Sequence, residues 1–125
     1  MLRALALWGP VVAWMALIFG ASAQNGAAAA SVPLADWITH GSAYLALSLL
    51  VARALSGGFR APLGRRGALL AFALSALYGV SDEWHQSFVP GREATLDDVA
   101  KDAAGAALGA LLASAVTRRN DERWG

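Results

Sequence analysis

Long apolar stretches alternate with short polar stretches along this chain. The apolar stretches cover residues 4–23, 37–55, 67–86 and 96–117. The polar pieces between them are 24–33, with small polar residues, 56–66, rich in Gly and Arg, and 89–95, with Pro-Gly-Arg. Because a helix needs roughly 20 residues to cross a hydrocarbon core, the pattern predicts an all-α integral membrane bundle of four transmembrane helices.

The composition supports this class of protein. Of the 125 residues, 57% are hydrophobic and only 15% are charged, and the mean hydropathy is +0.46. The length suits a single domain over residues 1–125. A net charge of +1 without a basic patch argues against nucleic-acid binding. The absence of cysteine excludes disulfide frameworks, thiolate metal sites and cysteine nucleophiles.

The basic residues predict the orientation of the bundle. Eight of the ten fall on one side of a four-span arrangement: Arg3, Arg53, Arg60, Arg65, Arg66, Arg118, Arg119 and Arg123. The other side receives Asp36, Asp82, Glu83, Glu93, Asp97, Asp98 and Asp102, with Arg92 and Lys101. Because basic residues are retained on the cytoplasmic side, we expect both termini in the cytoplasm and the acidic side outside it.

The first apolar stretch has an alternative interpretation as a cleaved signal peptide. Arg3 precedes it, and Ala21-Ser22-Ala23 resembles a cleavage site. Its length and its two tryptophans, Trp8 and Trp14, favour a retained helix. The other three spans keep their orientation in either case.

Polar residues in the apolar stretches follow helical spacing. In the third, Tyr78, Asp82, His85 and Gln86 share one face, and Glu83 lies on an adjacent face. The fourth and second stretches show the same spacing in two further sets: Asp98, Asp102, Gly105 and Gly109, and Trp37, His40 or Gly41, Tyr44 and Ser48. The glycine pair of the fourth stretch forms a GxxxG motif, which permits close helix packing or homodimerisation.

These polar faces predict a common pocket near the outer side of the membrane, because ionisable groups at membrane depth are costly unless they face the bundle interior. The connection before the fourth helix should be tight, since Pro90-Gly91 favours a turn. Thr95 has the position of an N-cap, with Asp98 three residues later. The expected lining comprises His40, Asp82, Glu83, His85, Arg92, Asp98 and Asp102.

The stretch YGVSDEWHQSFVPGREATLDDVAKDAAGAALGALL, residues 78–112, closely resembles the signature region of VanZ-like membrane proteins. The second helix resembles the family at Asp36, His40 and Tyr44. Family members often carry a lysine after that aspartate, where this chain has Trp37, so Lys101 or Arg92 would have to take over its role. The resemblance extends over nearly the whole chain, although only residues 78–112 are specific.

The resemblance implies a small four-spanning protein of a bacterial-type cytoplasmic (inner) membrane with a role in the cell envelope. The family's namesake is associated with resistance to the glycopeptide teicoplanin, without an established reaction. Resistance in this chain does not follow from the resemblance. Expected partners are membrane lipid and a lipid-linked cell-wall precursor or a glycopeptide.

Three functions remain open from the sequence. The first is binding of such a ligand, with Arg92 contacting an anionic head group. Its expected ligand-binding residues are His40, Tyr44, Asp82, Glu83, His85, Gln86, Arg92, Asp98 and Asp102. The second is a membrane enzyme with His85 as general base and Asp82 beside it. The third is a structural protein in which the polar residues only hold the helices together.

Two chemical questions concern the same residues. The first is metal binding. No fixed ligand spacing such as HExxH is present, and the ligands would have to come from separate helices. Because Arg92 would also oppose a bound cation, we expect no metal and no cofactor. Arg92 also has a simpler role available, as a salt bridge to Asp98 or Asp82 that holds the turn. The oligomeric state is left open.

Overall fold

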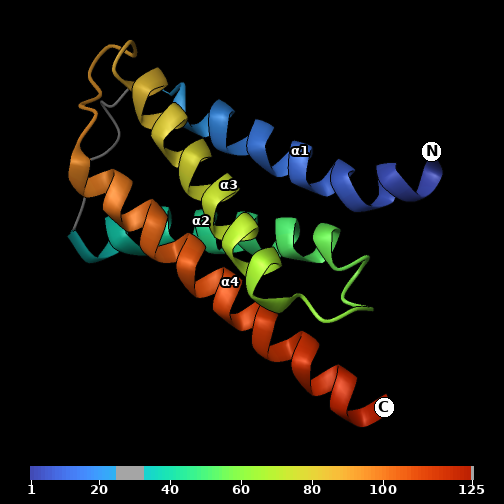
Figure 1. Ribbon diagram of the computed structural model, residues 1–125. Coiled ribbons are helices and arrows are strands. Elements are labelled where there is room, and N and C mark those ends of the chain that lie inside the picture. Colours follow the sequence, from blue (N-terminus) through green and yellow to red (C-terminus); the bar gives the residue numbers. More distant parts are fainter. Residues whose placement is uncertain (25–32, 125) are drawn as a thin grey trace.

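The computed structural model describes residues 1–24 and 33–124, and its regular elements are helices (Figure 1). They are α1 (Leu2–Ser22), α2 (Pro33–Leu55), α3 (Gly64–Gln86) and α4 (Leu96–Trp124). The predicted all-α fold is confirmed, and most helix ends lie within a few residues of the predicted ones. The predicted connection over 24–33 lies almost entirely outside the described residues, as does the side chain of Arg123.

Helix α4 is longer than predicted. The sequence predicted an end at Thr117, where the apolar stretch stops, but the helix continues through Arg118 and Arg119 to Trp124. Hydropathy marks where a helix can leave a membrane, not where it ends. Arginine and glutamate are good helix formers, and the segment after Thr117 contains no glycine or proline before Gly125 to stop the helix.

Three helical segments are long and apolar enough to cross a membrane, namely Leu2–Ser22, Asp36–Leu55 and Leu96–Asn120. Helix α3 is less clearly apolar, because Arg65 and Arg66 stand at its start and Asp82 and Glu83 near its end. Its outward face is nevertheless apolar, since Leu69 and Leu77 are each 66% exposed. Apolar residues that face outward are what a lipid environment requires.

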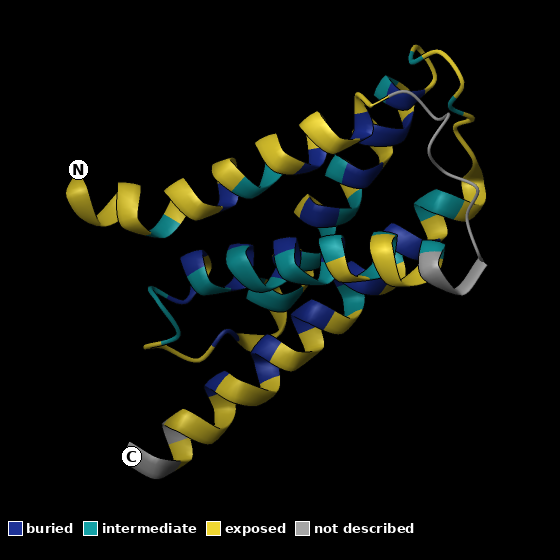
Figure 2. Ribbon diagram, turned by 180° about the vertical axis from the view of Figure 1, so that it is seen from behind, coloured by how far each residue is buried: buried dark blue, intermediate teal, exposed yellow. Residues whose placement is uncertain are grey.

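Helices α2 and α3 pack against each other, and both α1 and α4 pack against this pair. The buried core is built largely from small side chains, including Ala52, Ala71 and Ala106. Small residues let helices approach closely in a membrane, where van der Waals packing replaces the hydrophobic effect between helices. Figure 2 shows the buried positions on the inner faces of the helices and the exposed ones outside.

The two ends of the bundle differ in what they contain. Both termini and the α2–α3 connection lie at one end, and the α3–α4 connection lies at the other (Figure 1). Arg3 and Arg53 belong to the first end, in the first turn of α1 and the last turn of α2. We call the opposite end, with residues 87–95, the polar end, because the acidic side chains of α2, of α3 and of the first two turns of α4 lie there.

Candidate functional site

The chain enters α4 at the polar end through a tight, capped turn. Gly91 has φ of +77°, a left-handed conformation that glycine adopts without strain. The backbone N–H of Asp98 donates to Oγ1 of Thr95 at 3.1 Å, so the predicted N-cap is confirmed. These features bring the start of α4 back over the end of α3.

Lys101 lies at the centre of the first group of charges, which we call the lysine cluster (Asp36, Asp97, Asp98 and Lys101). Its ammonium contacts Asp36 directly and lies 2.7 Å from Asp97 and 2.8 Å from Asp98. It also lies 5.9 Å from the ring centroid of Trp37, within cation–π range. The cation beside Asp36 is thus supplied by α4.

His40 joins α2 to α4. Its Nδ1 lies 2.9 Å from Oδ1 of Asp102, and its Nε2 lies 3.7 Å from Oδ1 of Asp36. Asp102 is 1% exposed and packs against Gly79 of α3, where an added Cβ would lie 3.1 Å from the Cβ of Asp102. A side chain at Gly79 would require Asp102 to move by a few tenths of an ångström, so the glycine leaves room for Asp102.

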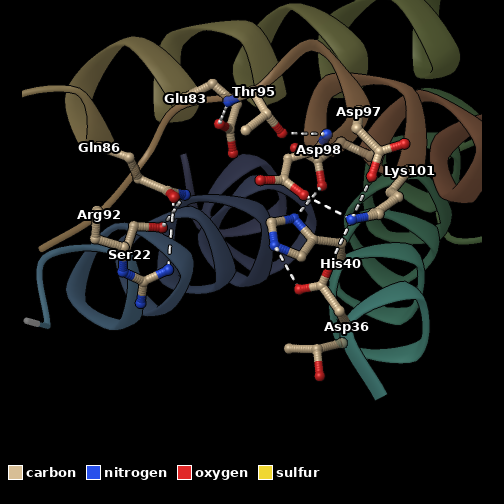
Figure 3. A network of polar contacts seen from close by, with 12 residues as sticks. Ser22, Asp36, His40, Glu83, Gln86, Arg92, Thr95, Asp97, Asp98 and Lys101 are labelled. Carbon is tan, nitrogen blue, oxygen red and sulfur yellow. Dashed lines mark hydrogen bonds and ion pairs between the residues drawn. The ribbon is translucent and has the colours of Figure 1, made fainter. Parts of the chain in front are cut away.

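Glu83 adds a carboxylate from α3. Glu83 is buried, with only 4% of its surface exposed. Its Oε2 accepts a hydrogen bond from the backbone N–H of Thr95 at 3.2 Å. In Figure 3 the Glu83 side chain lies beside Thr95, the residue before the start of α4. We call His40, Glu83 and Asp102 the histidine cluster, because ligand atoms of all three lie within 4.8 Å of one another.

A further group, the serine cluster (Ser22, Asp82 and Gln86), joins α1 to α3. Ser22 donates to Oδ2 of Asp82 at 2.5 Å, and the Gln86 side-chain amide donates to the same oxygen at 3.0 Å. All three side chains are buried. The sequence placed Ser22 only in the cleavage-site-like Ala21-Ser22-Ala23 and not among the polar residues expected to meet.

Arg92 donates hydrogen bonds to the C-terminal end of α1. Its Nε and Nη2 donate to the carbonyl oxygens of Gln24 and Ala21 at 3.1 and 3.2 Å, and Nη1 lies 3.5 Å from Oε1 of Gln86. A cation at a helix C-terminus is favourable because the last carbonyls lack helical partners. Among the described side chains, Arg92 pairs with neither Asp98 nor Asp82, so the ion pair considered from the sequence is replaced by bonds to carbonyls.

His85 lies apart from the three clusters. Its ring stacks on Phe19 with centroids 4.1 Å apart, and its Nδ1 is buried without a hydrogen-bond partner within the described part of the chain. It lines a mainly apolar pocket with Trp84 and Phe88. Ser81, one of its nearest hydroxyls in sequence, donates to the carbonyl of Tyr78 in its own helix.

An open polar pocket of about 470 Å³ lies over the lysine cluster. It is lined by Asp36, His40, Gln86, Gly91, Arg92, Glu93, Thr95, Asp97, Asp98 and Lys101. Four of the expected ligand-binding residues are in this lining: His40, Gln86, Arg92 and Asp98. Glu83 and Asp102 lie buried beside it, Tyr44 is 2% exposed in the core, and Asp82 and His85 line the apolar pocket. The residues expected to line one cavity are therefore divided between the polar pocket, the apolar pocket and the buried interior.

Two sets of side chains have the donor atoms of a metal site. They are Asp36, His40 and Asp98, and the histidine cluster. The ammonium of Lys101 already contacts two carboxylates of the first set. The second set contains no permanent cation.

Comparison with known proteins gives one finding. No curated protein and no solved structure matches the chain. The family model described as VanZ/LLP1 matches residues 7–117, which include α2, α3, most of α1 and α4, and the three clusters. Because this match extends over most of the sequence, the chain belongs to the VanZ/LLP1 family.

Proposed function

We propose that this protein is a membrane protein of the cell envelope that binds the polar part of a lipid-linked or cell-wall ligand at its polar end. The observation that carries the proposal is the open pocket of about 470 Å³, because its volume falls within the usual range for small-molecule sites. Charged side chains from α2, α4 and the α3–α4 connection converge there. Such convergence beside apolar helices suits a ligand with a polar head and a lipid tail.

The charges of the pocket favour a ligand with donors as well as an acidic group. Asp97 and Glu93 are exposed at the pocket, where their oxygens can accept from hydroxyl or amino groups. Arg92 uses three N–H groups on α1 and Gln86, and its guanidinium has five, so it retains donors for a carboxylate or phosphate. Cell-wall precursors and glycopeptides carry both kinds of group.

The distribution of basic residues supports a pocket that faces outward. Arg60, Arg65 and Arg118 belong to the end with the termini, which the positive-inside rule assigns to the cytoplasm. In this orientation the protein crosses a bacterial-type inner membrane several times with both termini inside. The polar end then meets the compartment that contains cell-wall ligands.

The alternative of an enzyme with His85 as base has less support. A general base needs a partner that orients its ring and a substrate proton within reach. His85 instead stacks on Phe19, and Asp82 accepts its hydrogen bonds from Ser22 and Gln86. The binding role therefore requires fewer rearrangements of the observed contacts.

Binding of two probes to the purified protein in lipid nanodiscs tests the proposal: a radiolabelled lipid-linked cell-wall precursor and teicoplanin. The double variant Glu93→Gln/Asp97→Asn removes exposed carboxylates of the pocket, and we expect it to bind at least about tenfold more weakly, a change of about 1.4 kcal/mol. Glu122→Gln is the matched control, because Glu122 is an exposed acid of α4 at the other end. If neither probe binds the parent, or the double variant binds as the parent does, the proposal is wrong.

A further inference from the structure

The histidine cluster gathers metal-ligand atoms from three different helices. His40 comes from α2, Glu83 from α3 and Asp102 from α4. Their ligand atoms lie within 4.8 Å of one another, and Nδ1 of His40 lies 2.9 Å from Oδ1 of Asp102. Two ligands bonded to one ion at about 2.1 Å each stand roughly 3 Å apart or slightly more, so this spacing suits a shared ion.

Both carboxylates of the cluster have an unused oxygen. Oε1 of Glu83 and Oδ2 of Asp102 are buried and have no hydrogen-bond partner in the described parts of the chain. Their side chains are 4% and 1% exposed. A buried carboxylate oxygen without a partner is costly, because it has lost its water and gained nothing in return. Two such oxygens beside one imidazole favour a cation bound between them.

The charge of the cluster indicates what kind of cation that is. Glu83 and Asp102 together carry two negative charges when ionised, and one divalent cation neutralises them. The two cations at the polar end contact other groups: Lys101 contacts the carboxylates of the lysine cluster, and Arg92 contacts α1 and Gln86. Among the described residues, neither of these two cations forms an ion pair with Glu83 or Asp102.

One ion-pair contact and one hydrogen bond around the cluster orient its ligands. Asp36 faces the second ring nitrogen of His40 at 3.7 Å, which suits a histidine that binds metal through Nδ1. The N–H of Thr95 holds one oxygen of Glu83 and leaves the other free. Such supporting contacts are typical of metal sites, since they fix the tautomer and the direction of each ligand.

We propose that His40, Glu83 and Asp102 bind one divalent transition-metal ion of the zinc class between α2, α3 and α4. One nitrogen and two carboxylate ligands favour such an ion over Mg²⁺ or Ca²⁺, which prefer oxygen ligands alone. Three protein ligands leave a coordination position for water or for a ligand group. Because His40 also lines the polar pocket, the ion has an entry path from that side.

The sequence conceals this site because its ligands are far apart along the chain. A spacing motif such as HExxH arises when two ligands share one helix, whereas here each helix supplies one. The inference does not depend on the proposed function. Metal binding is measured without any lipid or cell-wall ligand, so either idea can fail while the other stands.

Titration of the purified protein with Zn²⁺, and with Co²⁺ as a spectroscopic probe, tests the site. The protein must carry no polyhistidine tag. We expect one Zn²⁺ per chain, a rise in Tm with Zn²⁺, and Co²⁺ absorption bands that Zn²⁺ abolishes. Glu83→Gln and Asp102→Asn should each weaken binding by at least about tenfold.

The two histidines of the chain provide a matched pair of variants. His40→Gln should lose the Co²⁺ bands, whereas His85→Gln should keep them. Asp97→Asn, an exposed carboxylate of the same end, should bind as the parent does. If a ligand variant does not fold, Cu²⁺ electron paramagnetic resonance of the parent and of His85→Gln still reports whether one imidazole nitrogen binds the ion.

Three results would overturn the inference. The parent could bind no Zn²⁺ or Co²⁺, in which case Glu83 and Asp102 carry protons in place of an ion. Binding could persist in folded His40→Gln and disappear in His85→Gln. Binding could also depend on Asp97 and not on Glu83 or Asp102, which would place the ion on the surface of the lysine cluster.

Discussion

Gly105 of α4 lies directly against the backbone of Gly41 of α2: a Cβ atom added to Gly105 would stand 2.2 Å from the Gly41 carbonyl oxygen. One turn further along, a Cβ on Gly109 would stand 2.5 Å from the carbonyl oxygen of Leu45. The GxxxG motif thus packs α4 on α2 within the chain. This contact also places Asp102, one turn before Gly105, beside His40, the residue before Gly41.

The first prediction concerns this contact. Gly105→Ala should destabilise the protein by about 1–3 kcal/mol, because the new methyl group meets backbone that cannot rotate away. Thermal unfolding of the purified protein in detergent measures the effect. Gly20→Ala is the control: nothing lies within 4 Å of its added Cβ, and alanine in a helix should be neutral or stabilising by up to about 1 kcal/mol. Equal stability of the two variants would contradict the backbone contact.

The second prediction concerns Lys101, whose side chain is only 6% exposed. Lys101→Met keeps the length of the side chain but leaves Asp36 and Asp98 without their cation. We expect a loss of about 2 kcal/mol in the free energy of unfolding, less than for a fully buried pair because Asp36 is 27% exposed.

The same unfolding measurement on Asp97→Asn provides the comparison for Lys101. Asp97 is 68% exposed, so its ion pair is screened by solvent and its loss should cost less than about 1 kcal/mol. If Asp97→Asn proves as damaging as Lys101→Met, the buried contacts of Lys101 are not what stabilises the polar end.

The third prediction concerns orientation in the membrane. The chain has no cysteine, so single cysteines can be introduced without a background. Glu93→Cys should react with a membrane-impermeant maleimide in intact cells, and Arg119→Cys should react only after the membrane is opened, since basic residues stay inside. Both positions are exposed in the structure. Labelling of Arg119→Cys alone in intact cells would reverse the proposed topology.

The elements were predictable because their signals are local. Apolar runs of membrane length predicted α1 to α4 to within a few residues at most ends, and Thr95 predicted the start of α4. Helical spacing also placed Asp102, Gly105 and Gly109 on one face, and the structure buries all three. The true end of α4 was missed because hydropathy falls at Thr117 while helix propensity does not.

The pairing of the polar side chains was not predictable from these signals. Lys101 and Arg92 were interchangeable candidates for the cation of the site, yet Lys101 reaches Asp36 and Arg92 reaches the end of α1. No local pattern paired Ser22 with Asp82, which the packing of α1 on α3 brings together. His85 shares a helix with Asp82 but faces Phe19 instead of the polar pocket.

The amino-acid sequence by itself determined that this chain forms membrane-length helices with polar residues gathered toward one end, because hydropathy and helical period depend only on neighbours along the chain. The tertiary structure alone decided that His40, Glu83 and Asp102 meet while His85 stands apart. The rotation and offset of each helix depend on close contacts between helices, such as Gly105 on Gly41, and no local pattern specifies them.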